Sequence, residues 1–289
     1  MLAAGRTLVA DGAMGTMLFK KGLASGDCPE QVNLDHPYWL EQIASAYLEA
    51  GSDIVETNTF GGSPLKLAQY SLEDKTEEIN TAAVRAARNA VGDRALVAAS
   101  CGPCGHLLKP YGDIEPEQVL ESFERQIRAL VDAGVDLVCV ETMTDLNEAI
   151  LAVEACRRVS SSLPVSATMT FDFTPNGYFT IMGASIEQAA HDLADAGADV
   201  VGSNCGNGIV EMIRIAAEFK KHSNLPLLIQ SNAGLPELKD ETLVYPETPV
   251  FMAGRSRRLI DLGVNIIGGC CGTTPEHIAA IRAEVDRAN

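Results

Sequence analysis

The chain has 289 residues, of which 46% are hydrophobic and 21% charged, a composition typical of a globular protein with a substantial core. Its 22 basic and 39 acidic residues give a formal net charge of −17. This excess of acid argues against nucleic acid or membrane as a partner, because both attract clustered Lys and Arg. No apolar run reaches the roughly 18 residues that span a bilayer, and the first residues lack a signal-peptide layout, so we expect a cytoplasmic protein.

Short β-rich runs alternate with helical patterns along the whole chain. The expected strands are, in order, 7–10, 53–57, 95–100, 136–141, 164–169, 199–203, 225–230 and 265–268. Eight such units in a chain of this length predict an α/β fold, a single (β/α)8 TIM barrel over residues 1–289. A doubly wound open sheet is the alternative, which is disfavoured because no G-x-G-x-x-G motif follows the first strand.

An internal repeat supports the barrel. Segments 50–58, 133–141, 196–204 and 262–270 align without gaps, and each has Gly in second place followed by an apolar run. That Gly is expected to be the left-handed residue that ends a helix. The repeat puts polar or metal-binding residues at the carboxyl end of each strand, where barrel active sites are built. These residues are Asn58, Thr59, Glu141, Thr142, Asn204, Cys205, Cys270 and Cys271.

Three of the eight cysteines carry the strongest chemical pattern. Cys270 and Cys271 would point to opposite faces of a regular strand, but glycines at 268, 269 and 272 let the chain turn and bring both sulfurs to one side. Cys205 could supply a third sulfur across the barrel mouth. Three thiolates suit Zn²⁺ and leave a fourth position open. Buried structural cysteines, with or without a vicinal disulfide, are the alternative interpretation.

Five motifs together resemble the homocysteine S-methyltransferase family. They are Asp-Gly-Ala-Met-Gly-Thr at 11–16, Glu-Thr-Asn-Thr-Phe-Gly-Gly at 56–62, Ser-Asn-Cys-Gly at 203–206, Ser-Asn-Ala-Gly at 231–234 and Gly-Gly-Cys-Cys-Gly-Thr-Thr-Pro at 268–275. Within the family, the chain is most similar to the homocysteine-binding module of cobalamin-dependent methionine synthases. The resemblance runs from about residue 8 to 280.

The resemblance implies a zinc-bearing barrel that transfers a methyl group to the thiol of homocysteine, giving methionine. It implies that Cys205, Cys270 and Cys271 bind the zinc ion. It also implies that the polar end of the amino acid is bound by Asp11, Gly12, Ala13 and Glu141. Zinc binding deprotonates a thiol, and the thiolate is the nucleophile.

The chemistry of the remaining residues fits this assignment. Asp11 and Glu141 are expected to pair with the substrate ammonium, while backbone N–H groups near Gly12 and Ala13 hold its carboxylate. In the alternative interpretation, Asp11 only caps a turn and Glu141 lies at a solvated strand end. Asn58 and Asn232 lie at strand ends that face the same mouth. Either is expected to bind substrate, or to fill the fourth position on zinc when the thiol is absent.

The methyl donor is expected to be a methylated corrinoid carried by a separate protein. The chain resembles one module of a larger enzyme, and 289 residues leave no room for folate and corrinoid modules. A corrinoid is too large to enter a barrel, so its carrier should dock over the mouth at strands 1, 2 and 8. S-methylmethionine is the alternative donor. Betaine is disfavoured because only Phe60 remains where betaine-using relatives have an aromatic pair.

Two further hypotheses belong to other functional classes. The chain could be a non-catalytic barrel that binds zinc through its thiols, although such a protein has no use for an amino-acid pocket. Cys101-Gly-Pro-Cys104 spells a thioredoxin-like redox motif. That function needs a helix beginning at the first cysteine, and Gly105, Pro110 and Gly112 disfavour one.

Overall fold

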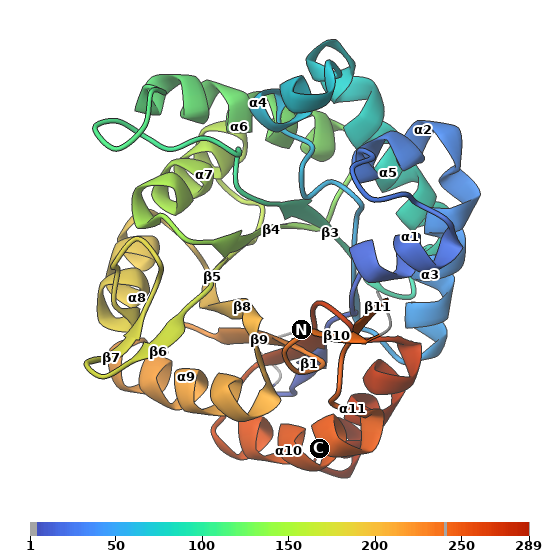
Figure 1. The fold of residues 1–289 in the computed structure, drawn as a ribbon, viewed down its shortest axis with the longest axis vertical. Coiled ribbons are helices and arrows are strands. Elements are labelled where there is room, and N and C mark those ends of the chain that lie inside the picture. Colours follow the sequence, from blue (N-terminus) through green and yellow to red (C-terminus); the bar gives the residue numbers. More distant parts are fainter. Residues whose placement is uncertain (1–4, 240–241, 289) are drawn as a thin grey trace.

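The computed structural model describes residues 5–239 and 242–288, and it contains the predicted barrel (Figure 1). Eight parallel strands form one sheet in the order β1-β12-β9-β8-β5-β4-β3-β2, and a bridge between Ala10 and Ile54 joins its two ends. The strands are β1 (Leu8–Val9), β2 (Ile54–Glu56), β3 (Leu96–Cys101), β4 (Leu137–Met143), β5 (Val165–Met169), β8 (Val200–Gly208), β9 (Leu227–Asn232) and β12 (Ile266–Gly269). All eight expected strands are therefore confirmed, with ends that differ by a few residues.

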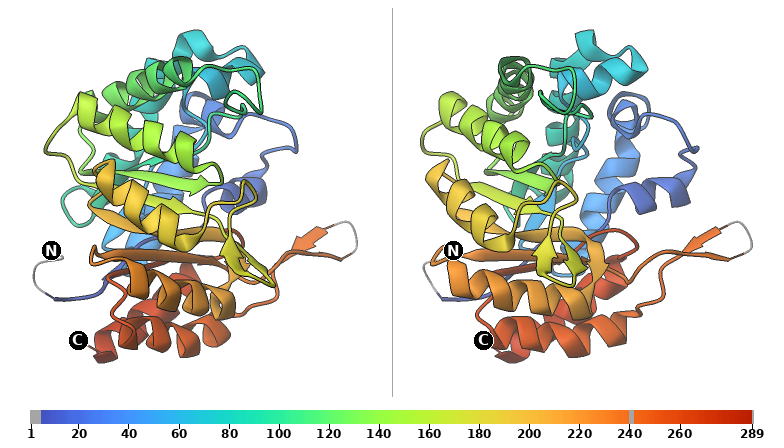
Figure 2. Two further views of the ribbon diagram at one scale, coloured as in Figure 1. Left: turned by 90° about the vertical axis from the view of Figure 1, so that its left-hand side faces the viewer. Right: turned by 60° about the vertical axis from the view of Figure 1, so that its left-hand side comes forward.

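Helices surround this barrel on its outer side (Figures 1 and 2). The α-helices are α1 (Gly15–Lys21), α2 (Val32–Asp35), α3 (Pro37–Glu49), α4 (Pro64–Leu67), α5 (Thr76–Val91), α6 (Pro116–Asp132), α7 (Leu146–Val159), α8 (Ile186–Asp195), α9 (Ile209–His222), α10 (Pro249–Asp261) and α11 (Pro275–Ala288). In the described part of the chain, none is long and apolar enough to cross a membrane.

Two small hairpins were not predicted from the sequence. β6 (Asp172–Thr174) pairs with β7 (Gly177–Phe179), and β10 (Glu237–Lys239) pairs with β11 (Thr242–Val244). Each strand has only three residues, too few to show a two-residue alternation. Both hairpins leave the barrel on the side of the carboxyl ends of its strands, and β10–β11 extends away from it (Figure 2).

Strand alternation divides the barrel interior into an apolar lower part and a polar upper part. Leu8, Ile54, Leu137, Leu228 and Ile266 belong to one buried cluster that fills the amino-terminal half of the barrel. Two residues further along each strand, the side chain returns to the same inner face. The residues at those later positions include Glu56, Ser100, Glu141, Asn204, Gln230 and Cys270. The same geometry that packs the core therefore gathers polar groups at one end.

The repeated glycines have the conformation that the repeat predicts. Gly51, Gly134, Gly197 and Gly263 have φ values of 97°, 92°, 107° and 75°, each directly after the end of a helix. These left-handed angles are readily adopted only by glycine, and they turn the chain from helix into strand.

The repeat also contains a clamp at the amino-terminal end of the barrel. Asp53 accepts the N–H of Val9, Asp136 that of Val97, Asp199 that of Val165, and Asn265 that of Leu227, at 2.8–3.0 Å. The four acceptors thus tie β2 to β1, β4 to β3, β8 to β5 and β12 to β9. The clamps account for the fourth position of the repeat, which has no part in the pocket.

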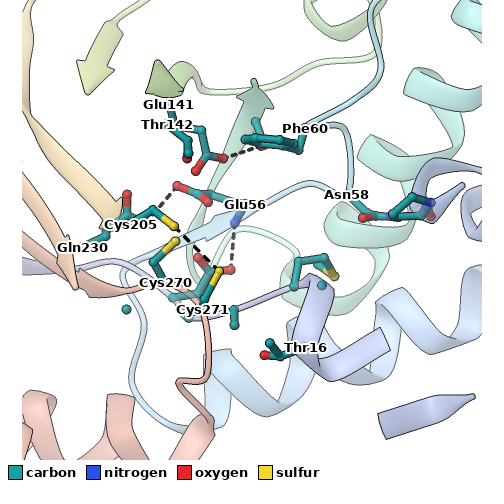
Figure 3. A pocket seen from close by; sticks show the side chains of 18 of the residues that line it. Thr16, Glu56, Asn58, Phe60, Glu141, Thr142, Cys205, Gln230, Cys270 and Cys271 are labelled. Atoms are coloured by element: carbon teal, nitrogen blue, oxygen red, sulfur yellow. Dashed lines mark hydrogen bonds between the residues drawn. The ribbon is translucent and has the colours of Figure 1, made fainter. Parts of the chain in front are cut away.

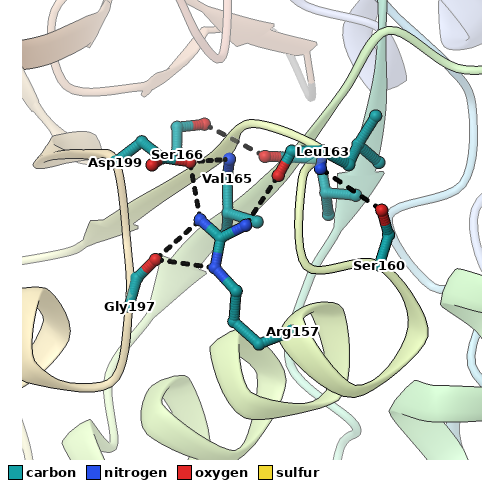
Figure 4. A network of polar contacts seen from close by, with 8 residues as sticks. Arg157, Ser160, Leu163, Val165, Ser166, Gly197 and Asp199 are labelled. Atoms are coloured by element: carbon teal, nitrogen blue, oxygen red, sulfur yellow. Dashed lines mark hydrogen bonds and ion pairs between the residues drawn. The ribbon is translucent and has the colours of Figure 1, made fainter.

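Three of these clamps also bind an arginine from a helix, which is the preceding helix for Arg88 and Arg157 and the last helix of the chain, α11, for Arg282. Arg282 contacts Asp53 at 3.0 Å, Arg88 contacts Asp136 at 2.7 Å, and Arg157 contacts Asp199 at 2.6 Å. Arg157 additionally donates to the carbonyl groups of Gly197 and Leu163 (Figure 4). Its guanidinium therefore ties together the end of α7, the turn before β5 and the turn before β8.

Two glycines provide a matched test of the barrel packing. A Cβ at Gly202 would lie 1.8 Å from the Leu228 carbonyl oxygen on the neighbouring strand, whereas a Cβ at Gly254, within α10, meets no atom within 4 Å. Gly202→Ala should lower the free energy of unfolding by about 1–3 kcal/mol or more because backbone cannot move aside. Gly254→Ala should raise it by about 0.5–1 kcal/mol. Urea unfolding measures both, and equal effects would contradict the packing of β8 on β9.

Candidate metal and amino-acid site

The three predicted cysteines come together at the carboxyl end of the barrel (Figure 3). Cys205 lies in β8, and Cys270 and Cys271 directly follow β12. Their Sγ atoms all lie within 4.8 Å of one another, and those of Cys205 and Cys271 are 3.8 Å apart. None is in a disulfide, and each is partly exposed. Among the described residues, this is the only group of three or more Cys, His, Asp or Glu side chains that is arranged to hold a metal ion.

Local backbone geometry explains how three sulfurs from two strands converge. Cys205 has a φ of 60°, a left-handed conformation that is costly for a residue with a Cβ, and it turns the thiol away from the regular strand direction. Gly272 has a φ of 80° and packs against the Tyr245 ring, where a Cβ would lie 2.1 Å from Cγ. The predicted turn after β12 is thus present, and it brings both neighbouring thiols to one side.

Hydrogen bonding among the thiols distributes their charge unequally. Donation from Cys270 and Cys271 lowers the pKa of Cys205 to about 3, while the negative Cys205 raises the pKa of Cys271 to about 11 and also raises that of Cys270. Without a cation, the cluster therefore holds one negative charge easily and resists a second and a third. A divalent cation favours the ionised form of all three thiols.

Asn232 supplies an oxygen beside this cluster. It is the last residue of β9, its amide hydrogen-bonds Cys205, and its buried Oδ1 has no hydrogen-bond partner. A buried carbonyl oxygen without a donor is costly, and a metal ion can satisfy it. Three thiol sulfurs with one unpartnered oxygen are donors that fit a tetrahedral zinc ion.

Buried carboxyl groups form the second half of the site. Asp11, just beyond β1, accepts the N–H of Glu56 at 2.9 Å through Oδ2, while its buried Oδ1 has no partner. Glu141, in β4, accepts hydrogen bonds from the Ser100 hydroxyl and from Asn204 Nδ2. Burial is the main cause that raises the pKa of both carboxyl groups; the negative charge of Glu141 adds to it at Asp11, and that of Glu56 adds to it at Glu141. A positively charged ligand would reverse both shifts.

Like Glu30, Glu56 is a carboxyl group on the pocket that the sequence analysis did not select. It lies in β2, and its Oε1 accepts a hydrogen bond from Gln230 Nε2 at 3.1 Å. Two-residue alternation from Ile54, a barrel-core residue, would have placed Glu56 on the inner face. The motif that contains Glu56 had instead directed attention to Asn58.

Asn58 lies farther from the sulfur atoms than Glu56 and Glu141 do (Figure 3). Its Nδ2 donates to the Pro29 carbonyl and to Asn33 Oδ1, each at 2.7 Å. These bonds hold the loop after β2 against α2. Asn58 still lines the pocket, but its amide group already has partners.

Gly12 and Ala13 follow Asp11 along the pocket wall. The Ala13 N–H donates to Thr273 Oγ1 at 3.1 Å, and a Cβ at Gly12 would lie 2.7 Å from the same oxygen. The turn after β1 is therefore packed closely on the loop that carries Cys270 and Cys271. This contact joins the two halves of the site.

Apart from Asn232, the predicted site residues all line one pocket, with a cavity volume of about 320 Å³; they are Asp11, Gly12, Ala13, Asn58, Glu141, Cys205, Cys270 and Cys271. Its aromatic lining residues are Phe19, Phe60 and Tyr245, of which the sequence analysis considered only Phe60. Its described lining includes no Lys, Arg or His. The pocket thus combines acidic and sulfur groups with aromatic side chains, one of which, Tyr245, hydrogen-bonds Cys271.

The other cysteines have a different environment. Cys101 and Cys104 are fully buried outside this pocket, and the Cys101 thiol donates to Gln126 Oε1 at 3.2 Å. Cys101 is the last residue of β3, so no helix begins there. The arrangement that a thioredoxin-like motif requires is missing at this place.

Comparisons with known proteins agree with this geometry. The family model described as homocysteine S-methyltransferase matches residues 8–285. Proteins named methionine synthase from Mycobacterium leprae and Mycobacterium tuberculosis are 34% and 33% identical over 98% and 97% of this chain. This chain spans about a quarter of the length of these two curated relatives.

A solved structure supports the fold independently. The metallated form of the Escherichia coli homocysteine methyltransferase MmuM superimposes with a TM-score of 0.80 at 23% identity, covering 96% of each chain. Its apo form has a TM-score of 0.75. At this identity, the likeness establishes the barrel architecture.

Proposed function

The chain belongs to the homocysteine S-methyltransferase family, and we propose that it transfers a methyl group to the thiol of homocysteine beside a zinc ion held by Cys205, Cys270 and Cys271. The observation that carries this proposal is the joint presence of three converging thiols and the buried carboxyl groups of Asp11 and Glu141 on one pocket. Zinc, when bound, keeps the substrate thiol ionised at neutral pH. The cytoplasmic location expected from the sequence stays a prediction.

The residues of the pocket would orient the amino acid. Asp11 Oδ1, which has no partner in the protein, and Glu141 are suited to accept the N–H groups of the substrate ammonium. Gly12 and Ala13 are proposed to hold the carboxylate from the turn after β1, where the Ala13 N–H would exchange Thr273 Oγ1 for a carboxylate oxygen. With its polar end fixed there, the substrate would extend its thiol toward the sulfur cluster. Such fixed orientation is a major source of rate enhancement.

Asn232 is better placed than Asn58 to occupy the fourth zinc position in the absence of substrate. Its Oδ1 is free of hydrogen bonds and its amide contacts Cys205, whereas the Asn58 amide already binds Pro29 and Asn33. We therefore assign the exchangeable position to Asn232. Asn58 is proposed to shape the pocket wall.

For the methyl donor, we propose a methylated corrinoid presented by a separate protein. Its support is the similarity to proteins named methionine synthase, of which this chain covers one part. A cavity of about 320 Å³ admits homocysteine but not a corrinoid. The carrier would therefore dock over the loops after β1, β2 and β12.

The second candidate donor is a small sulfonium compound such as S-methylmethionine. Phe19, Phe60 and Tyr245 line the pocket, and aromatic faces attract cations. This observation makes a cationic donor more plausible than the sequence analysis allowed. A barrel that only stores zinc is disfavoured, because such a protein would not need the acidic pocket.

Zinc binding tests the cysteine assignment. Replacing Cys205, Cys270 or Cys271 by Ser should remove the single bound zinc, because each supplies a third of the protein's thiolate ligands. A double variant of Cys101 and Cys104 should keep zinc, provided it folds, because both side chains lie outside the site. Metal analysis of purified protein measures this. Zinc retained by Cys270→Ser but lost from the Cys101/Cys104 variant would contradict the assignment.

Glu141→Gln tests the ammonium site. The variant keeps a hydrogen-bonding side chain but loses the negative charge, so homocysteine affinity should fall about 10- to 150-fold, equivalent to about 1.5–3 kcal/mol. Zinc content should not change. Titration calorimetry of the zinc-loaded protein gives the affinity, and an unchanged value in a folded variant would exclude Glu141 from ammonium binding.

The donor is tested by supplying homocysteine with free methylcobalamin or with S-methylmethionine and measuring methionine. Methylcobalamin should support slow turnover, because the carrier that would position the corrinoid is absent. Rapid turnover with S-methylmethionine and none with methylcobalamin would favour the second candidate. That result would leave the zinc and homocysteine assignments unchanged.

A further inference from the structure

Tyr245 is an aromatic side chain of the pocket whose hydroxyl group contacts a sulfur atom. It hydrogen-bonds Cys271, one of the three proposed zinc ligands. Its ring lies against Gly272, where a Cβ would come within 2.1 Å of Cγ. A phenol with an ordinary pKa of about 10 keeps its proton at neutral pH, whereas a cysteine bound to a metal ion is a thiolate with no proton to donate. In the metal site the hydroxyl group is therefore the donor and the Cys271 sulfur the acceptor.

The segment that carries Tyr245 is bonded to the strand ends that carry the sulfur atoms. Glu247, two residues further on, donates its N–H to the Ala233 carbonyl and accepts the Ile209 N–H through Oε2, at 2.9 and 3.0 Å. The Glu247 carbonyl accepts a hydrogen bond from His277 Nε2 at 2.9 Å. These three partners follow β9, β8 and β12 along the chain. The contacts that place the Tyr245 hydroxyl thus come from the same three strand ends that place the sulfur atoms.

The other two sulfur atoms also have hydrogen-bond donors that are not thiols. Cys205 accepts the backbone N–H of Gly206 and the side-chain amide of Asn232. Asn204 Nδ2 lies 3.9 Å from the Cys270 sulfur. These donors are backbone and side-chain groups that keep their protons when a metal ion displaces those of the thiols. Each sulfur of the cluster therefore has a hydrogen-bond donor that remains in the metal-bound site.

Such donors matter because every thiolate on a zinc ion is a nucleophile, including those of the protein. A cysteine that accepted a methyl group would become an uncharged thioether, and the site would lose one of its three anionic ligands. A donated hydrogen bond lowers the basicity of a sulfur atom, and nucleophilicity falls with basicity. A hydrogen-bonded thiolate is thus a poorer methyl acceptor than one without a donor.

We propose that Tyr245 directs the methyl group to the substrate, because its hydrogen bond to Cys271 lowers the nucleophilicity of that sulfur. In the side reaction that Tyr245 opposes, the Cys271 sulfur forms a bond to the methyl carbon while the bond from this carbon to the donor breaks. The electron pair of the broken bond leaves with the donor. Tyr245 acts through Cys271 and is therefore a positioning residue that determines specificity. This inference rests on the proposed metal site.

Methyl iodide is the suitable probe because it is small, needs no carrier protein and releases iodide when it methylates a sulfur atom. The zinc-loaded full chain is treated so briefly, without homocysteine, that most molecules stay unmethylated. Peptide mass spectrometry then gives the ratio of methylation at Cys271 to that at Cys205, whose donors are unchanged. Tyr245→Phe keeps the ring and removes the hydroxyl group, so this ratio should rise about 2- to 10-fold, the effect of one lost hydrogen bond.

Tyr178→Phe is the matched control. Its hydroxyl group donates to Glu211 Oε2 at 2.7 Å, and neither residue lines the pocket. The ratio of Cys271 to Cys205 methylation should equal that of the wild type. A rise as large as that in Tyr245→Phe would show that the contact between Tyr245 and Cys271 is not the cause, and it would overturn the proposal.

A second variant separates the hydrogen bond from packing and access. 3-Fluorotyrosine at position 245 alone keeps the ring and the hydroxyl group but makes the phenol a stronger acid and a stronger donor. The methylation ratio should then fall below that of the wild type, opposite to the change in Tyr245→Phe. An unchanged or raised ratio in the fluorinated protein would overturn the proposal, even if Tyr245→Phe does not fold.

Metal analysis before the treatment distinguishes this inference from the function on which it rests. A wild-type chain that binds no zinc would reject the metal site itself. With one zinc bound per chain, an equal methylation ratio in the wild type and Tyr245→Phe would reject only the role of Tyr245.

Discussion

The two-residue alternation of the barrel strands is the constraint on which the site depends. Each inward-facing residue is followed by another two positions later, so a strand that fills the lower core with Leu or Ile must also project its later side chains into the same interior. In this chain those later positions carry carboxyl, amide and thiol groups. The core and the pocket are therefore the lower and upper layers of the same barrel interior. The position of each polar group follows from the packing of the inward-facing residues beneath it.

Negative charge at the upper level explains much of the chemistry. The thiols and the carboxyl groups meet where the described lining offers no basic side chain, so cations from outside the protein must balance them. A metal ion suits the sulfur end and an ammonium group suits the carboxyl end. Because charges in a confined space interact strongly, the two ends need not be independent, and filling one changes the protonation of groups near the other.

The sequence allowed the barrel and the thiol cluster to be predicted, since both depend on local patterns. Gly51 and its three counterparts mark where strands begin, and the glycines around Cys270 and Cys271 permit the turn that brings the sulfurs together. The features of the site that could not be predicted from the sequence depend on contacts between distant segments. The partners of Asn58 lie on α2 and on the turn before it, and Tyr245 reaches the pocket from beyond an unpredicted hairpin. Glu56 is different, because alternation alone could have placed it.

The clamps divide the barrel into four pairs of strands, which are β1 with β2, β3 with β4, β5 with β8, and β9 with β12. At three of the four places where one pair meets the next, an arginine on the intervening helix binds the aspartate of a clamp. Arg88, Arg157 and Arg282 each join one pair to the next, and Arg282 does so across the ends of the chain. The fourth junction, between α9 and Asn265, has a neutral residue in place of the aspartate. The order of the pairs in the ring is thus independent of where the polypeptide starts. A circular permutant opened just after α9 would keep all three links and every clamp.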